Sequence, residues 1–180
     1  MTPALTFLHC PKCGLRRPRV VDETPLRCDH CGFVYYFNPT VAAAAILLQA
    51  DGRGLFIRRA KEPSQGMLGL VGGFIDIGET AETALRREVR EEVNLEIRSL
   101  RFLCSEPNRY VYREVTYPVL DLFFVATVED PQQARALDEV ASFAWLDPQQ
   151  VNPAEMAFPS MSRALELFQS GGYGASPTPG

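Results

Sequence analysis

Apolar residues recur about every fourth position along residues 81–93, on an otherwise charged background. The apolar positions are Ala81, Leu85, Val89 and Val93, and Ala84 widens the stripe. This period predicts an amphipathic helix with one buried face. Thr80 can cap its start, and Asn94 can end it because Asn tolerates the left-handed conformation.

Short apolar runs bounded by turn residues predict strands before and after this helix. We expect strands at 41–49, 55–59, 67–75, 96–104, two within 110–128, and 141–146. Asp51-Gly52, between the first two, is typical of a hairpin turn. A second amphipathic helix is expected over 159–169, so the elements favour an α/β fold.

Length and charge describe an ordinary globular chain of 180 residues with a net charge of −4. This length suits one domain with an appendage. The acidic balance disfavours nucleic acid or an anionic membrane as a bulk electrostatic partner, although a local basic patch stays open. No apolar run approaches the roughly 20 residues that span a bilayer. Residues 1–20 lack the apolar core of a secretion signal, so we expect a cytoplasmic location.

Four cysteines near the N-terminus form two close pairs. Cys10, Cys13, Cys28 and Cys31 read C-x2-C-x14-C-x2-C, and glycine follows each pair. This spacing predicts a zinc ribbon in which the metal supplies much of the folding free energy. The alternatives are two disulfides, which a cytosolic setting disfavours, or a redox pair, which the lack of a βαβ context disfavours. The fifth cysteine, Cys104, is expected to pack as a small apolar residue.

Three glutamates share one face of the helix predicted over 81–93. Glu88, Glu91 and Glu92 stand at i, i+3 and i+4, where like charges repel by about 0.2–0.5 kcal/mol per pair. Carboxylates gathered beside a glycine pair suit Mg2+ or Mn2+, which prefer oxygen ligands. The alternative is a solvated, charged surface of an amphipathic helix.

The full pattern around these acids resembles the motif of the Nudix hydrolase family, G-x5-E-x7-R-E-U-x-E-E-x-G-U, where U is apolar. The matching residues are Gly73, Glu79, Arg87, Glu88, Val89, Glu91, Glu92 and Leu95. Only Asn94 departs, where the family usually has Gly. The resemblance covers roughly residues 40–170 and implies an α/β/α sandwich.

With the cysteine motif, the resemblance suggests three parts: a zinc ribbon at 1–38, a Nudix hydrolase domain at 39–170 and a disordered tail at 171–180. It also favours a homodimer. The implied activity is hydrolysis of a nucleoside diphosphate linked to another moiety. The alternative is a nucleotide- or nucleic-acid-binding sensor module with a catalytically idle Nudix fold.

Site roles follow from the same resemblance. Glu88, Glu91 and Glu92 would bind the catalytic Mg2+ or Mn2+, together with the backbone carbonyl of Gly72. Glu79 and Arg87 match a pair that braces the glycine loop against the helix.

A zinc ribbon before a Nudix domain is similar to the NADH pyrophosphatase branch. That branch carries S-Q-P-W-P-F-P-x-S after the Nudix motif, and residues 105–110 here read S-E-P-N-R-Y, so only the S-x-P start is kept. Tyr110 and Tyr112 could stack on a base, and Arg109 could contact a phosphate. Arg58, in a cluster with Arg59 and Lys61, is a further phosphate candidate. Each of these residues could equally be an ordinary strand or hairpin residue.

A carboxylate outside the motif is expected to complete the site. Glu114 and Glu129 are candidates, but Glu139 precedes an apolar strand ending in Trp145, and this position resembles one that the NADH pyrophosphatase branch uses. Glu139 would act as a general base or bind another metal ion.

Overall fold

The computed structural model describes residues 1–16 and 25–171, so most of the predicted tail lies outside it. The chain divides into two compact units. One comprises Met1–Thr40 with Arg109–Val119, and the other comprises Val41–Asn108 with the rest of the chain.

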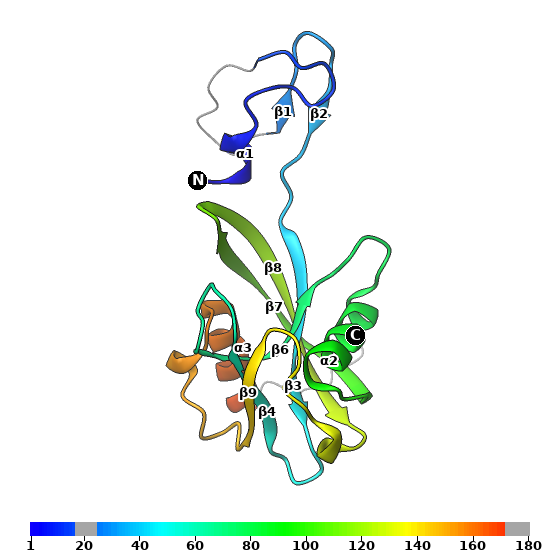
Figure 1. Ribbon diagram of the computed structural model, residues 1–180, viewed down its shortest axis with the longest axis vertical. Helices are drawn as coiled ribbons and strands as arrows, with labels where there is room; N and C mark the ends of the chain where they lie inside the picture. Colours follow the sequence, from blue (N-terminus) through cyan, green and yellow to red (C-terminus); the bar gives the residue numbers. More distant parts are fainter. Residues whose placement is uncertain (17–24, 172–180) are drawn as a thin grey trace, which may run out of the picture. The chain divides into compact units, whose positions relative to one another are not determined.

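A seven-stranded sheet forms the centre of the larger unit (Figure 1). Its strands are β3 (Thr40–Leu48), β4 (Gly54–Arg59), β5 (Leu68–Gly69), β6 (Val71–Phe74), β7 (Ile97–Tyr112), β8 (Val115–Val128) and β9 (Val140–Leu146). The main order is β5-β4-β3-β8-β7, while β6 pairs with β3 and β9 pairs with β4. Helices α2 (Ala81–Val93) and α3 (Pro159–Gln169) lie on either side of this sheet (Figure 1), which confirms the expected α/β/α sandwich.

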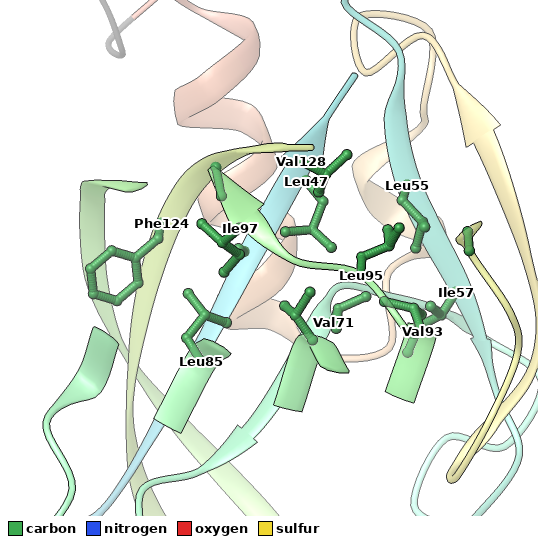
Figure 2. Close-up of a cluster of buried hydrophobic side chains, with 14 of the residues drawn as sticks. Leu47, Leu55, Ile57, Val71, Leu85, Val93, Leu95, Ile97, Phe124 and Val128 are labelled. Carbon is green, nitrogen blue, oxygen red and sulfur yellow. The ribbon is translucent and has the colours of Figure 1, made fainter. Parts of the chain in front are cut away.

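The hydrophobic core lies between the sheet and α2 (Figure 2). Leu85, Val89 and Val93 project from the helix and are fully buried. Leu47 and Leu55 meet them from β3 and β4. The period read from the sequence therefore identified the buried face of α2 correctly.

Both ends of α2 have the predicted caps. The Thr80 hydroxyl accepts a hydrogen bond from the Thr83 backbone N–H at 3.2 Å. Asn94 is left-handed, with φ of 56°, and its N–H bonds to the carbonyl of Arg90. Asn thus supplies the helix end that the family usually builds with Gly.

Strand β7 is longer than the sequence predicted. We expected a strand ending at Cys104, but β7 continues through Pro107 to Tyr112. Pro107 lacks a backbone N–H and would interrupt a central strand. Since β7 is the last strand in the sheet order, proline is tolerated there, and the predicted boundary was wrong.

Apart from the ends of β7 and β8 within Arg109–Val119, the described residues of the smaller unit form short elements: α1 (Pro3–Thr6), β1 (Leu26–Arg27) and β2 (Val34–Tyr35). Two tight turns follow the cysteine pairs. Gly14 and Gly32 have φ of 75° and 71°, and their N–H groups bond to the carbonyls of Cys10 and Cys28. Glycine adopts this backbone conformation without strain.

Two single-turn 3-10 helices, η1 (Pro131–Gln133) and η2 (Pro153–Glu155), complete the fold. Within residues 1–16 and 25–171, no helix has the length and apolar character needed to cross a membrane.

Candidate active site

The glycine pair brings β6 close to both its neighbouring strand and α2. Gly72 has φ of 147°, and a Cβ there would collide with the carbonyl of Ala43 on β3. A Cβ on Gly73 would collide with the carboxylate of Glu88. A side chain is excluded at Gly72 by the backbone of β3, and at Gly73 it would displace the carboxylate of Glu88, so the backbone of β6 lies directly against the acidic face of the helix.

Hydrogen bonds from Arg87 join the loop after β6 to α2. Its Nε and Nη2 donate to the two carboxylate oxygens of Glu79 at 2.9 and 2.8 Å. Nη2 also donates to the carbonyl of Phe74, and Glu79 accepts from the N–H of Asp76. Hydrogen bonds from Arg87 lower the pKa of Glu79 to about 2, so this pair stays charged. These bonds join the loop after β6 to α2 and support the bracing role predicted for Glu79 and Arg87, which stays a prediction.

Arg87 also contacts two of the three acids on the helix face. Its Nη1 lies 2.7 Å from Glu88 Oε1 and 3.2 Å from Glu91 Oε2. One guanidinium therefore offsets part of the repulsion among the carboxylates of α2.

Glu92 is the most deeply buried of the three acids, with 7% of its surface exposed. Its Oε2 accepts a hydrogen bond from the N–H of Gly72 at 3.0 Å. Burial raises its pKa to about 8, and the nearby charges of Glu88 and Glu139 add to the shift. Burial also raises the pKa of Glu88. These carboxylates lie where a cation would stabilise their ionised forms.

The acids open onto a pocket of about 300 Å3. Its lining contains Gly72, Gly73, Phe74, Asp76, Arg87, Glu88, Glu91, Glu92, Asp138 and Glu139. Glu139 therefore joins the helix acids from a segment about 50 residues further along the chain. Asp76 and Asp138 also line the pocket, and sequence reasoning missed both.

The position of Glu139 depends on an irregularity between β4 and β9. Their register shifts between Arg58 and Arg59, which leaves Arg59 opposite Val140. Such bulges re-aim neighbouring residues. Glu139 then adopts φ of 60°, and its carbonyl accepts from the N–H of Ala60 at 2.9 Å.

Lys61 holds the side chains of this acidic turn. Its Nζ lies 3.2 Å from Glu139 Oε1 and 3.4 Å from Asp138 Oδ1. The sequence showed Lys61 only as a member of a basic cluster on the β4 side. Its contact with Glu139 depends on pairing between strands that are distant in the sequence.

Other predicted residues lie away from this pocket lining. Arg58 donates to the carbonyl of Gly66 at 3.2 Å and does not line the pocket. Glu129 is exposed and is also absent from the lining. The remaining candidates belong to the smaller unit, so their roles stay predictions: Arg109, Tyr110, Tyr112 and Glu114.

The oxygen-rich pocket fits a hard divalent cation. Carboxylate and carbonyl oxygens are the ligands that Mg2+ and Mn2+ prefer, and no thiol or imidazole lines the pocket. Glu88, Glu91, Glu92 and Glu139 are the residues that could hold it. Their carboxylate oxygens are more widely spread than the thiols of the four N-terminal cysteines, which among the described residues form the compact ligand group.

That cysteine group consists of Cys10, Cys13, Cys28 and Cys31, whose sulfurs all lie within 4.8 Å of one another. The Sγ atoms of Cys10 and Cys31 are 3.7 Å apart, as are those of Cys13 and Cys28. A tetrahedron with Zn–S bonds of about 2.3 Å has edges of about 3.8 Å. The four thiols are unbonded to one another, so the set fits zinc and not two disulfides.

The fold, the glycine pair and the acidic helix together define a family. A model for the NUDIX domain matches residues 38–168, and the chain belongs to this family.

Sequence relatives confirm the resemblance to the NADH pyrophosphatase branch. "NAD-capped RNA hydrolase NudC" of Haemophilus influenzae is 33% identical over 105 residues, which cover 57% of this chain and 39% of that protein. Human "NAD(P)H pyrophosphatase NUDT13, mitochondrial" is 36% identical over 97 residues, covering 54% of this chain and 27% of the relative. The matched regions thus span less than half of each relative.

Solved structures share the fold. A NUDIX hydrolase from Nitrosomonas europaea superposes with a TM-score of 0.70 at 22% identity, covering 94% of each chain. The NUDIX domain of Shewanella oneidensis NrtR, solved in complex with ADP ribose, has a TM-score of 0.60 at 20% identity. It covers 74% of this chain and 88% of that one.

Proposed function

We propose that this chain hydrolyses the diphosphate bond of a nucleoside diphosphate linked to another moiety, with Mg2+ or Mn2+ as cofactor. One observation carries the proposal: Glu88, Glu91, Glu92 and Glu139 line a single pocket beside Gly72 and Gly73 of β6. A purely structural helix has no need for a buried acid such as Glu92 in the same pocket as a second acid from the turn before β9.

The bound divalent ion would neutralise the diphosphate and acidify the attacking water. Residues of the chain bind the ion, accept the proton and hold the loop in place. Glu88, Glu91 and Glu92 provide the negative charge that holds the ion. Glu139 provides a carboxylate from the turn before β9 that can accept a proton from water. Arg87 and Glu79 hold the glycine loop so that the backbone of β6 stays against the helix.

The substrate class rests on relatives and on pocket chemistry. The relatives named above carry names of enzymes acting on NAD-capped RNA or NAD(P)H, and one structural neighbour was solved with ADP ribose. These compounds share an adenosine diphosphate joined to a second group. We infer that this chain acts on such a molecule.

A substrate panel tests this proposal. NADH, ADP-ribose, a dinucleoside polyphosphate and a deoxynucleoside triphosphate would be incubated with the protein and Mg2+, and products separated by chromatography. We expect AMP and a second monophosphate from an ADP-linked substrate. Binding of a nucleotide without turnover, in a folded protein supplied with Mg2+ or Mn2+, would favour the idle sensor module instead.

We further propose that the four cysteines bind one structural Zn2+ and that the protein is a homodimer. Ultracentrifugation at several concentrations tests the dimer.

Glu139→Gln should reduce turnover by roughly 100-fold, because Gln cannot accept the proton from water. The measurement is kcat across pH and Mg2+ concentration. We expect the variant to lose the part of the wild-type pH profile that reports ionisation of a base. Glu114→Gln is the matched control, since Glu114 lies in the β7–β8 turn. Wild-type behaviour of Glu139→Gln in both pH and Mg2+ dependence would remove it from the site.

Lys61→Ala should lower kcat by about two- to tenfold, because the Glu139 side chain loses its ion pair. KM should change little, and Lys61→Arg should recover part of the loss. The control is Arg53→Ala, which breaks an exposed ion pair with Asp51 in the β3–β4 turn. A change in KM alone would show that Lys61 acts on the substrate and not through Glu139.

A further inference from the structure

The smaller unit contains a pocket of its own, with a volume of about 240 Å3. One wall is formed by Phe7 after α1 and by Tyr35 and Phe37 around β2. Tyr117 and Pro118 of β8 also line it. All its lining residues belong to this unit, and none is a cysteine of the zinc site.

Aromatic rings give this pocket flat apolar surface. Phe7 and Tyr35 are stacked, with centroids 5.9 Å apart and planes 18° apart. Phe37 meets both rings edge-on, at 5.3 and 5.1 Å. Tyr35 remains 44% exposed, so part of its ring is available to a ligand. An exposed ring held by neighbours can stack on a planar group at little cost in side-chain entropy.

Polar side chains also reach the surface of this pocket. The side chains of Asn38 and Thr40 also line the pocket and offer both donors and acceptors.

Charge limits the ligand further. Among the residues that the structure describes, no Asp, Glu, Lys or Arg lines the pocket, which favours a neutral group inside it. The segments of this unit nevertheless carry seven Lys and Arg against four Asp and Glu, whereas the rest of the chain carries eleven against eighteen. With four thiolates neutralised by one zinc ion to a charge of −2, the unit remains slightly basic. A neutral planar group attached to a phosphate matches this distribution.

We propose that this pocket binds a nucleobase, stacked on the aromatic wall, with its polar edge toward Asn38 and Thr40. An aliphatic ligand would make no use of the exposed ring of Tyr35 or the amide of Asn38, and a phosphate or carboxylate would find no charged partner inside. The base can belong to a free nucleotide or to a single strand, since both present the same ring. This site is separate from the carboxylate pocket and does not depend on the proposed hydrolysis.

The test is an NMR titration of the zinc-loaded full chain without Mg2+. The probes are AMP, pentaadenylate and a short proline-rich peptide, which is the alternative occupant of an aromatic groove. We expect AMP or pentaadenylate to shift the signals of Ala4, Tyr35 and Tyr117. Equal affinity for both probes identifies a mononucleotide site, and binding of pentaadenylate alone identifies a strand.

Two variants and one control separate this pocket from any other nucleotide site. Thr40→Val and Asn38→Leu should each weaken binding by about three- to tenfold, the range expected for one lost hydrogen bond. Tyr36→Ala should leave it unchanged, since Tyr36 is exposed beside Tyr35 but does not line the pocket. Zinc content and spectral dispersion check that each variant is folded. Shifts confined to residues 41–108 and 120–171, binding of the peptide alone, or full affinity in both variants would overturn the proposal.

Discussion

Glu92→Gln is expected to reduce hydrolysis by roughly 10³-fold or more and at the same time to stabilise the metal-free protein. The catalytic loss follows because the helix loses the buried carboxylate nearest the glycine backbone, and with it negative charge for the divalent ion. The gain in stability follows because burial opposes ionisation of Glu92, and glutamine carries no charge. Glutamine keeps the size of the side chain and an oxygen that can accept from the N–H of Gly72.

The sign of the pH dependence follows from the raised pKa of Glu92, which is about 8 in the folded protein. An unfolded glutamate has a pKa of about 4.3. Between these values the folded state binds more protons than the unfolded state, so the free energy of unfolding falls as pH rises. Above about pH 8 Glu92 is ionised in the folded state as well. The cost of burying its charge then lowers the free energy of unfolding by a few kcal/mol.

Calorimetry without Mg2+, at pH 5 and pH 8, measures this effect. The Tm of the variant should be higher than that of the wild type. This Tm difference should be several degrees larger at pH 8 than at pH 5. Glu82→Gln is the control, because Glu82 is exposed on the first turn of the same helix. Adding Mg2+ should raise the Tm of the wild type and have much less effect on Glu92→Gln. An equal Tm difference at both pH values would contradict the assigned environment of Glu92.

Loss of zinc should unfold the N-terminal segment while the larger unit keeps its structure. This segment has two strands of two residues each, which cannot hold together through their own pairing. Cys10 and Cys28 are buried, so their sulfurs occupy the centre of the small core. Structural zinc sites contribute about 10–16 kcal/mol of binding free energy, which far exceeds what so small a core supplies.

Cys28→Ser should therefore lose zinc and expose residues 1–38 to protease, with the catalytic unit remaining resistant. Cys104→Ser is the matched control, since Cys104 lies on β7 outside the metal set. Elemental analysis reports the zinc content, limited proteolysis reports which unit is cleaved, and amide NMR reports whether each unit stays folded. A zinc-free protein whose N-terminal signals stay dispersed would contradict the structural role of the metal.

Local features of the site were predictable from sequence because their causes are local. The spacing of Glu88, Glu91 and Glu92 places them on one face of any helix. The steric need for Gly72 and Gly73 also acts over short distances, although its partners, Ala43 and Glu88, appear only in the structure.

The rest of the site depends on strand pairing. Glu139 could be named as a candidate from its position before an apolar strand, but its presence in the pocket requires the shifted register of β4 and β9. The ion pair of Lys61 depends on the same register. The extension of β7 depends on its place in the sheet, where Pro107 disrupts no central pairing. Periodicity carries no information on which strands become neighbours.

Product analysis by 31P NMR shows directly whether the carboxylates of α2 support metal-dependent hydrolysis of a diphosphate. Zinc-loaded wild-type protein and Glu92→Gln would each be incubated with ADP-ribose or NADH, with and without Mg2+. We expect two phosphomonoester signals to replace the diphosphate signals only in the wild-type sample containing Mg2+. Equal diphosphate cleavage by Glu92→Gln, or by the wild type without any divalent ion, would contradict a metal-dependent hydrolase built on the carboxylates of α2.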